Sequence, residues 1–142
     1  MKKVRDILDV KGLSVWSIGP DASVFAALKL MAEKDVGALV VLDGDNLVGI
    51  ISERDYARKI ALLGRASPTT QVKEIMTTDV VCVDPEQSVD ECMAVVTEKR
   101  IRHLPVLENG KLIGLISIGD LVKSIITEQQ FIIEQLERYI TG

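Results

Sequence analysis

The chain has 142 residues, of which 47% are apolar and 27% are charged, and its net charge is −4. This length suits one compact domain or two very small ones, and the composition excludes wholesale disorder. The acidic balance argues against a dedicated nucleic-acid-binding protein, and no apolar run approaches the roughly 18 residues that span a bilayer. The first residues lack the apolar stretch of a signal peptide, so we expect a cytoplasmic protein that does not bind membranes.

The sequence offers little material for catalysis or metal binding. Cys82 and Cys92 form neither a metal-binding pattern nor a disulfide framework, and His103 is the only histidine. A zinc site or a histidine-dependent catalytic triad would need more such residues. We therefore expect no catalytic residues and no metal.

The sequence contains an internal duplication with a shift of 65 residues. Of the 40 positions from Ile18 to Ala57, 13 are identical in the second copy without a gap. A second similarity relates Val4–Leu8 to Val72–Met76 with a shift of 68 residues, so the first copy has three extra residues between Leu8 and Ile18. Such self-similarity indicates two related repeats.

Each repeat shows the same succession of patterns. After a short first strand, apolar residues at helical spacing follow Ser23 and Ser88, which are suitable helix N-caps. Two apolar runs joined by a tight connection then predict a β-hairpin, and a second helix begins near Glu53 and near Ile118. The hairpin strands are expected at residues 38–42 and 47–51 in the first repeat, and at 104–107 and 112–116 in the second.

These patterns predict an α+β fold made of two β-α-β-β-α repeats. One unit of about 60 residues is marginal alone, so we expect the two sheets to pack together about a pseudo-twofold axis with the helices outside. The predicted repeats are residues 1–66 and 67–126, joined by the polar segment Gly64–Gln71. Residues 127–142 have no counterpart in the first repeat and are predicted to extend the last helix.

The predicted C-terminal extension has an apolar stripe. Ile125, Ile132, Leu136 and Ile140 share one face of the helix, joined by Ile133 and Phe131, and such a face must be buried. Packing against its own repeat and pairing in a homodimer are two alternatives that the sequence leaves open.

The sharpest local motif is Gly-x-x-Ser-x-x-Asp, which occurs once in each repeat, as Gly49, Ser52 and Asp55 and as Gly114, Ser117 and Asp120. In a purely structural interpretation, the serine caps the helix and the aspartate lies near its positive end. In a ligand-binding interpretation, the hydroxyl donates to an anion and the aspartate accepts hydrogen bonds from two ribose hydroxyls. The glycine would then let a ligand approach the backbone closely.

The duplicated pattern resembles the cystathionine-β-synthase (CBS) domain family, of which a tandem pair is called a Bateman module. The residues involved are the two motifs above, Leu104-Pro105-Val106 after Arg102-His103, and Glu74-Ile75-Met76-Thr77. The resemblance covers the chain from about Val4 to Ile126, and Ser52–Arg58 is similar to stand-alone bacterial signalling members. It implies that AMP, ADP, ATP, NAD or S-adenosylmethionine binds in clefts between the repeats, as a regulatory ligand and not as a catalytic cofactor.

The resemblance also implies which residues hold the ligand. Asp55 and Asp120 would bind the ribose hydroxyls of two separate sites, and Ser52 and Ser117 would help to hold ribose or phosphate. The remaining pocket residues would be Ser17, Ile18, Gly37, Ala38, Cys82, Val83, Arg102, His103 and Pro105.

The two copies are not equivalent. Arg54 lies between the serine and the aspartate of the motif in the first repeat, where the second has Gly119, and Arg102-His103 replaces Gly37-Ala38. We hypothesise that the Asp55 site binds phosphate better, because Arg54 can reach an anion at the start of the helix. Arg102 and His103 would supply charge from across the cleft, although His103 equally suits a structural role.

We predict a non-catalytic, regulatory sensor of adenine nucleotides that acts as a homodimer on an unidentified downstream protein. An enzyme is disfavoured because the sequence has no nucleophile–base pair, dinucleotide fingerprint or Walker loop. The alternatives are an S-adenosylmethionine sensor and a structural or partner-binding module whose pockets are vestigial.

Overall fold

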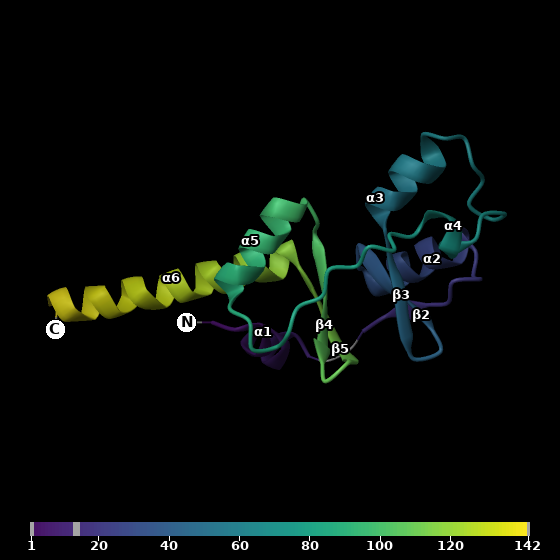
Figure 1. Ribbon diagram of the computed structural model, residues 1–142. Coiled ribbons are helices and arrows are strands. Elements are labelled where there is room, and N and C mark those ends of the chain that lie inside the picture. Colours follow the sequence, from purple (N-terminus) through teal and green to yellow (C-terminus); the bar gives the residue numbers. More distant parts are fainter. Residues whose placement is uncertain (1, 13–14, 142) are drawn as a thin grey trace. The chain divides into compact units, whose positions relative to one another are not determined.

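The computed structural model describes residues 2–12 and 15–141 and divides the chain into two compact units. Unit 1 comprises residues 1–13 and 82–142, and unit 2 comprises residues 14–81. Both contain helices and strands (Figure 1). The predicted α+β class is confirmed.

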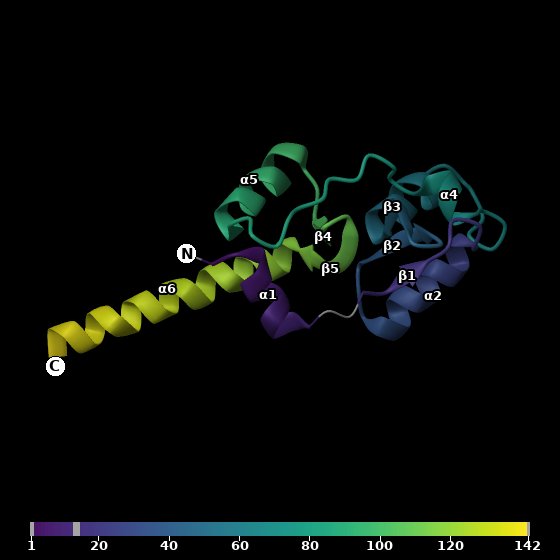
Figure 2. The same cartoon turned by 60° about the horizontal axis from the view of Figure 1, so that its bottom comes forward.

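Unit 2 is built on a three-stranded sheet of order β1-β2-β3, with β1 (Ser17–Ile18) parallel to β2 (Ala38–Asp43) and β3 (Asn46–Ser52) antiparallel to β2. Between β1 and β2 lies α2 (Val24–Lys34), which runs alongside the sheet in Figure 2. After β3 the chain forms α3 (Glu53–Tyr56), the π-helical segment η1 (Ala57–Ala61) and, beyond a loop, α4 (Val72–Ile75).

Unit 1 repeats this plan with a shorter sheet. It contains α1 (Val4–Lys11), α5 (Val89–Lys99), and the antiparallel hairpin of β4 (His103–Glu108) and β5 (Lys111–Ser117). The chain then continues into α6 (Ile118–Thr141). The first strand of this repeat, predicted at Cys82–Val83, is reduced to one parallel bridge between Val83 and Val106.

Local sequence signals explain these elements. The Oγ atoms of Ser23 and Ser88 accept hydrogen bonds from the backbone N–H groups three residues on, which confirms both predicted N-caps. Both hairpins shift register at the same place, between Val41 and Leu42 and between Val106 and Leu107, as the 65-residue duplication requires.

The core of unit 2 is a single cluster of buried apolar side chains. It joins α2, both hairpin strands, η1 and α4, through Val24, Ala27, Met31, Leu39, Val41, Ile51, Ile60, Val72 and Ile75. The sheet therefore has one face covered by helices.

The units do not follow the boundaries of the sequence repeats. The first helix of the chain, α1, belongs to the unit that contains the second repeat, and its counterpart α4 belongs to the unit that contains the first. Val4 and Leu8 are buried, and the Val4 and Arg5 N–H groups donate to Gln87 and Pro85 of the same unit. The sequence boundary at residues 66 and 67 describes the duplication, whereas each compact unit combines segments from both repeats.

A glycine makes room for each short helix. An added Cβ at Gly49 would lie 2.9 Å from the backbone oxygen of Thr77, just after α4, and one at Gly114 would lie 2.6 Å from Leu8 Cδ2 in α1. The glycine of the Gly-x-x-Ser-x-x-Asp motif thus allows a helix to approach the hairpin. The expectation that it admits a ligand to the backbone is wrong, because protein atoms fill that space.

The predicted extension of the last helix is confirmed, since α6 continues to Thr141. Its residues from 129 to 141 are all exposed. Among the helices of residues 2–12 and 15–141, none is long and apolar enough to cross a membrane.

We expect Gly49→Ala to lower the free energy of unfolding by about 1–3 kcal/mol, because overpacking displaces neighbours. The Thr77 oxygen cannot move away easily, since it accepts a hydrogen bond of 3.0 Å from the Ile50 N–H. Gly114→Ala is the matched control and should cost less, because its nearest neighbour is the rotatable end of Leu8. Urea denaturation of the two variants measures both losses, and an equal or larger loss for Gly114→Ala would contradict this account.

Candidate ligand-binding sites

Each unit places one predicted aspartate at the junction between its hairpin and the following helix. In unit 2, Ser52 ends β3 and Asp55 is the third residue of α3. The Ser52 N–H donates to Asp55 Oδ2 over 3.0 Å, and the Asp55 N–H donates to Ser52 Oγ over 3.2 Å. This reciprocal arrangement is a capping box, so the structural interpretation of the motif is realised.

The Asp55 carboxylate has further partners, and the residue is only 9% exposed. Ser52 Oγ donates to Oδ2 over 3.1 Å, and Thr77 Oγ1 donates to Oδ1 over 3.1 Å. The Lys59 ammonium lies 3.5 Å from Oδ1 and donates to the Ile75 carbonyl over 2.9 Å. Both carboxylate oxygens therefore already have protein partners, and a ligand hydroxyl would share or replace them.

In unit 1, Ser117 and Asp120 form the equivalent pair. The Ser117 N–H donates to Asp120 Oδ2 over 2.8 Å, and the Asp120 N–H donates to Ser117 Oγ over 3.1 Å. Here the additional partner is Lys11, the last residue of α1, whose ammonium donates to Asp120 Oδ2 over 2.6 Å and to the Leu115 carbonyl over 2.7 Å. A lysine thus supports Asp120 directly, whereas a threonine hydroxyl and a more distant lysine support Asp55.

This lysine affects the charge state of Asp120. Burial alone would raise the pKa of the carboxyl, but the hydrogen bonds from Lys11 and Ser117 outweigh it, and the pKa of Asp120 is lowered. Asp120 is therefore anionic at neutral pH and able to accept hydrogen bonds.

In each unit, the other predicted site residues lie in, beside or paired with the hairpin that precedes its aspartate. In unit 2, Ala38 is paired with Ser52, and the Gly37 carbonyl accepts from the Glu53 N–H over 3.0 Å. Ser17 and Ile18 pair with the same strand, β2, two and three positions beyond Ala38. Arg54 lies beside Asp55 and is exposed.

The same contacts recur in unit 1. His103 is paired with Ser117, and the Arg102 carbonyl accepts from the Ile118 N–H over 2.9 Å. Pro105 is buried in β4 and its carbonyl accepts from the Val83 N–H over 2.9 Å. Cys82, next to this bridge, is half-buried, and burial raises the pKa of its thiol. Burial also raises the pKa of Cys92 to about 11, so neither thiol is activated as a nucleophile.

Sequence reasoning missed the partners of the two aspartates. Thr77 belongs to a segment that resembles the family pattern, and Lys59 follows Asp55 at the i+4 spacing of helical ion pairs, so both had a signal. No sequence signal pointed to Lys11, because the duplication aligns it with Asp79, a residue of opposite charge. Within the described ranges 2–12 and 15–141, no group of three or more His, Cys, Asp or Glu side chains is placed to hold a metal ion.

Comparison with known proteins identifies the class to which this architecture belongs. The family model for the CBS domain matches residues 4–62 and 72–127, one match for each repeat. The chain therefore belongs to the CBS domain family, as its motifs predicted.

Individual relatives agree with this assignment. A mitochondrial CBS domain-containing protein of Arabidopsis thaliana, CBSX3, is 40% identical over 98% of this chain and 72% of its own length. A solved structure from Burkholderia ambifaria, described as a candidate signal-transduction protein with CBS domains, has a TM-score of 0.87 and 56% identity over 90% of this chain and 96% of that one. The hexameric CBS-CP12 protein of bloom-forming cyanobacteria has a TM-score of 0.76 and 33% identity over 86% of this chain and 70% of that one.

We expect Lys11→Met to raise the pKa of Asp120, because it removes the cation that favours the carboxylate. A carboxyl NMR titration measures this directly. Lys73→Met is the control, since Lys73 pairs with Asp21 in unit 2 and should leave the Asp120 titration unchanged.

The same ion pair gives stability a defined pH dependence. A folded-state pKa below the ordinary value of 3.8 stabilises the fold above pH 3.8, and this contribution disappears as the pH falls through the lowered pKa. The difference in unfolding free energy between wild type and Lys11→Met should therefore shrink in acid. A difference that grows as the pH falls would contradict the assignment.

Proposed function

We propose that this CBS domain pair is a non-catalytic regulatory module that binds an adenine nucleotide, AMP, ADP, ATP or NAD, at Asp55 and Asp120. The observation that best supports it is the recurrence, at the same junction in both units, of a carboxylate that accepts a hydrogen bond from the N–H of the motif serine. Two carboxylate oxygens can accept hydrogen bonds from the two vicinal hydroxyls of a ribose. The relative described as a candidate signal-transduction protein supports a regulatory role.

Binding in this scheme is an exchange of hydrogen bonds. A ribose hydroxyl that reaches Asp55 replaces or shares the contact from Thr77, and one that reaches Asp120 competes with Lys11. Such binding transmits a signal only if the ligand prefers one of two conformations of the protein. A change in the position of Thr77 or Lys11 provides a local event from which that preference can arise.

The alternative is a structural or partner-binding module. It is favoured by one specific observation, namely that both oxygens of Asp55 already have protein partners. In that case the serines and aspartates serve only as helix caps. An S-adenosylmethionine sensor is the third candidate, since that ligand also presents a ribose to the same carboxylates.

Self-association is part of the proposal. The homodimer implied by the family is supported by an apolar stripe on α6 that remains exposed in the single chain, and one relative is described as hexameric. Its downstream protein would read the conformation of the assembly. Localisation to the cytoplasm also stays a proposal, since one relative is mitochondrial.

Thermal melts with AMP, ADP, ATP, NAD and S-adenosylmethionine test the proposal. A ligand at 100 times its Kd should stabilise the fold by roughly 2.7 kcal/mol, which raises Tm by several degrees. Asp55→Asn and Asp120→Asn should each weaken binding about ten- to hundredfold at one site, since a hydrogen bond to a charged group is lost.

Two controls make the melts decisive. Asp43→Asn and Asp90→Asn alter exposed aspartates outside the junctions and should leave the ligand-induced shift intact. No shift with any of the five ligands would support the structural module. Turnover of a ligand would instead support an enzymatic function.

Arg54→Ala should weaken nucleotide binding at the Asp55 site and reduce its dependence on salt, because a cation near the phosphates would be lost. Arg58→Ala is the matched control, as an exposed arginine one helical turn further on. Calorimetric titrations at two salt concentrations measure both effects. Identical isotherms for wild type and Arg54→Ala would remove Arg54 from the site.

A further inference from the structure

The longest helix of the protein has one apolar face that its own unit does not cover. Positions 118, 122, 125, 129, 132 and 136 of α6 follow one another in alternating steps of four and three residues. Next to them on the helix surface lies a row of isoleucines that repeats every seven residues. This is the spacing of a seam at which two helices pack. Every position of the seam is apolar except Gln129, and the row consists of Ile126, Ile133 and Ile140.

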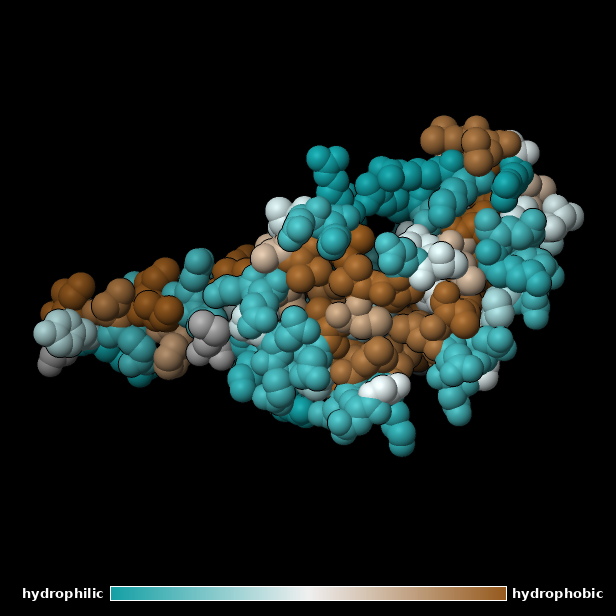
Figure 3. Space-filling model, viewed as in Figure 1, coloured by the Kyte–Doolittle hydropathy of each residue, from teal (hydrophilic) through white to brown (hydrophobic). Residues whose placement is uncertain are grey.

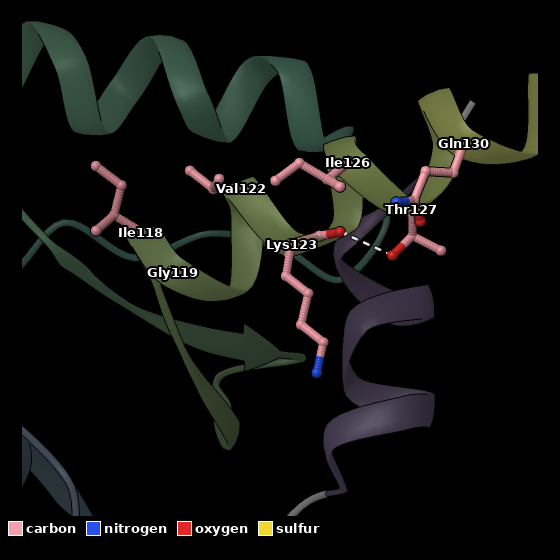
Figure 4. Close-up of a pocket in the computed structure, with 7 residues that line it drawn as sticks. All are labelled: Ile118, Gly119, Val122, Lys123, Ile126, Thr127 and Gln130. Carbon is pink, nitrogen blue, oxygen red and sulfur yellow. Dashed lines mark hydrogen bonds between the residues drawn. The ribbon is translucent and has the colours of Figure 1, made fainter. Parts of the chain in front are cut away.

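The first half of this face borders a groove on unit 1. Ile118, Val122 and Ile126 of the face line one side of it, and Gly119, Lys123, Thr127 and Gln130 line the rest. Figure 4 shows Ile118, Val122 and Ile126 along the same side of the helix, and these side chains are 38–49% exposed. This half is anchored in the unit, because Leu121 is fully buried.

The second half of the face is a row of apolar side chains on the segment of α6 whose residues are all exposed. Ile132, Ile133, Leu136 and Ile140 are between 49% and 80% exposed. In Figure 3 hydrophobic residues gather along this end of α6. At 1.5 Å per residue, the segments 118–127 and 131–140 are each about 15 Å long, so one matches the other in length.

We propose that α6 pairs with the α6 of a second copy in antiparallel orientation, so that the second half of each helix covers the groove of the other. The inference rests on the proposed self-association and names the surface that performs it. A two-fold axis at Gln129 places Val122 opposite Leu136, Ile125 opposite Ile133 and Ile126 opposite Ile132. Every apolar seam residue then meets an apolar partner.

Charge favours the antiparallel orientation over the parallel one. With the axis at Gln129, Lys123 of one copy lies opposite position 135, between the acidic Glu134 and Glu137. In a parallel pair in register, Lys123 would face Lys123 and Glu137 would face Glu137. Like charges that face each other oppose association, and opposite charges select the orientation.

The polar residue at the centre fits a two-fold axis. A glutamine side chain both donates and accepts hydrogen bonds, so two copies of Gln129 can pair with each other. A single polar residue in an apolar seam fixes the register at some cost in stability. Because the contact is two-fold, each substitution in it acts twice.

The first test is the mass of the full-length chain by sedimentation or light scattering. Ile133→Asp should weaken self-association by at least about tenfold, since it places a charge opposite Ile125 at two symmetry-related points. Phe131→Asp is the matched control. Phe131 is exposed, and the helical repeat of 3.6 residues places it away from the seam, contrary to its predicted membership of the stripe, so the mass should stay unchanged. Both positions are exposed in the single chain, so neither variant should prevent folding.

Cysteine cross-linking then determines the orientation. A mixture of Val122→Cys chains and Leu136→Cys chains should form a disulfide between unlike chains, identified by mass spectrometry, whereas neither variant alone should cross-link. Cross-linking of each variant with itself would show a parallel pair and overturn the inference. The wild-type chain, with Cys82 and Cys92, is the background control.

These outcomes separate the inference from the proposed self-association. If the wild type is a dimer that Ile133→Asp does not weaken, the helix pairing is wrong while the homodimer stands. If the wild type is a monomer at all concentrations tested, both are wrong.

Discussion

The close contact between each hairpin and a short helix from the start of the other repeat organises each compact unit. Gly49 and Gly114 lie where a side chain would collide with the segment of α4 or with α1. Only a residue without a Cβ lets the helix lie this close, and the buried side chains of Val4, Leu8, Val72 and Ile75 then complete the two cores. The core of each unit is thus completed by a short helix from the other sequence repeat.

This contact also determines the chemistry around the two aspartates. Because α1 ends at Lys11, a full positive charge reaches Asp120, and because Thr77 follows α4, a neutral hydroxyl reaches Asp55. A capping box fixes each carboxylate in nearly the same place, but the donors that a ligand would displace differ between the units. The duplication has therefore produced two junctions with the same geometry and unequal electrostatics.

The sequence was sufficient to predict the elements and the cluster of residues at each junction. Periodicity identified both hairpins and the helices after Ser23 and Ser88, and the duplication matched Ser52–Asp55 with Ser117–Asp120. Those features depend on residues close together in the chain. The exchange of α1 and α4, the true role of Gly49 and the contact of Lys11 with Asp120 depend on segments far apart in the chain, about which local patterns say nothing.

The division of the chain also has a consequence for the order in which the protein folds during synthesis. Unit 2 is a continuous stretch, residues 14–81, so all its parts leave the ribosome one after another, with no segment of unit 1 between them. Helix α1 leaves before unit 2, yet eight residues are too few for a stable isolated helix, and the segment that buries it begins at residue 82. Closing the intervening loop of about 75 residues costs entropy that grows only slowly with loop length. The residues of α1 are therefore among the last to reach their native place, after the chain has already completed the unit between them and their partners.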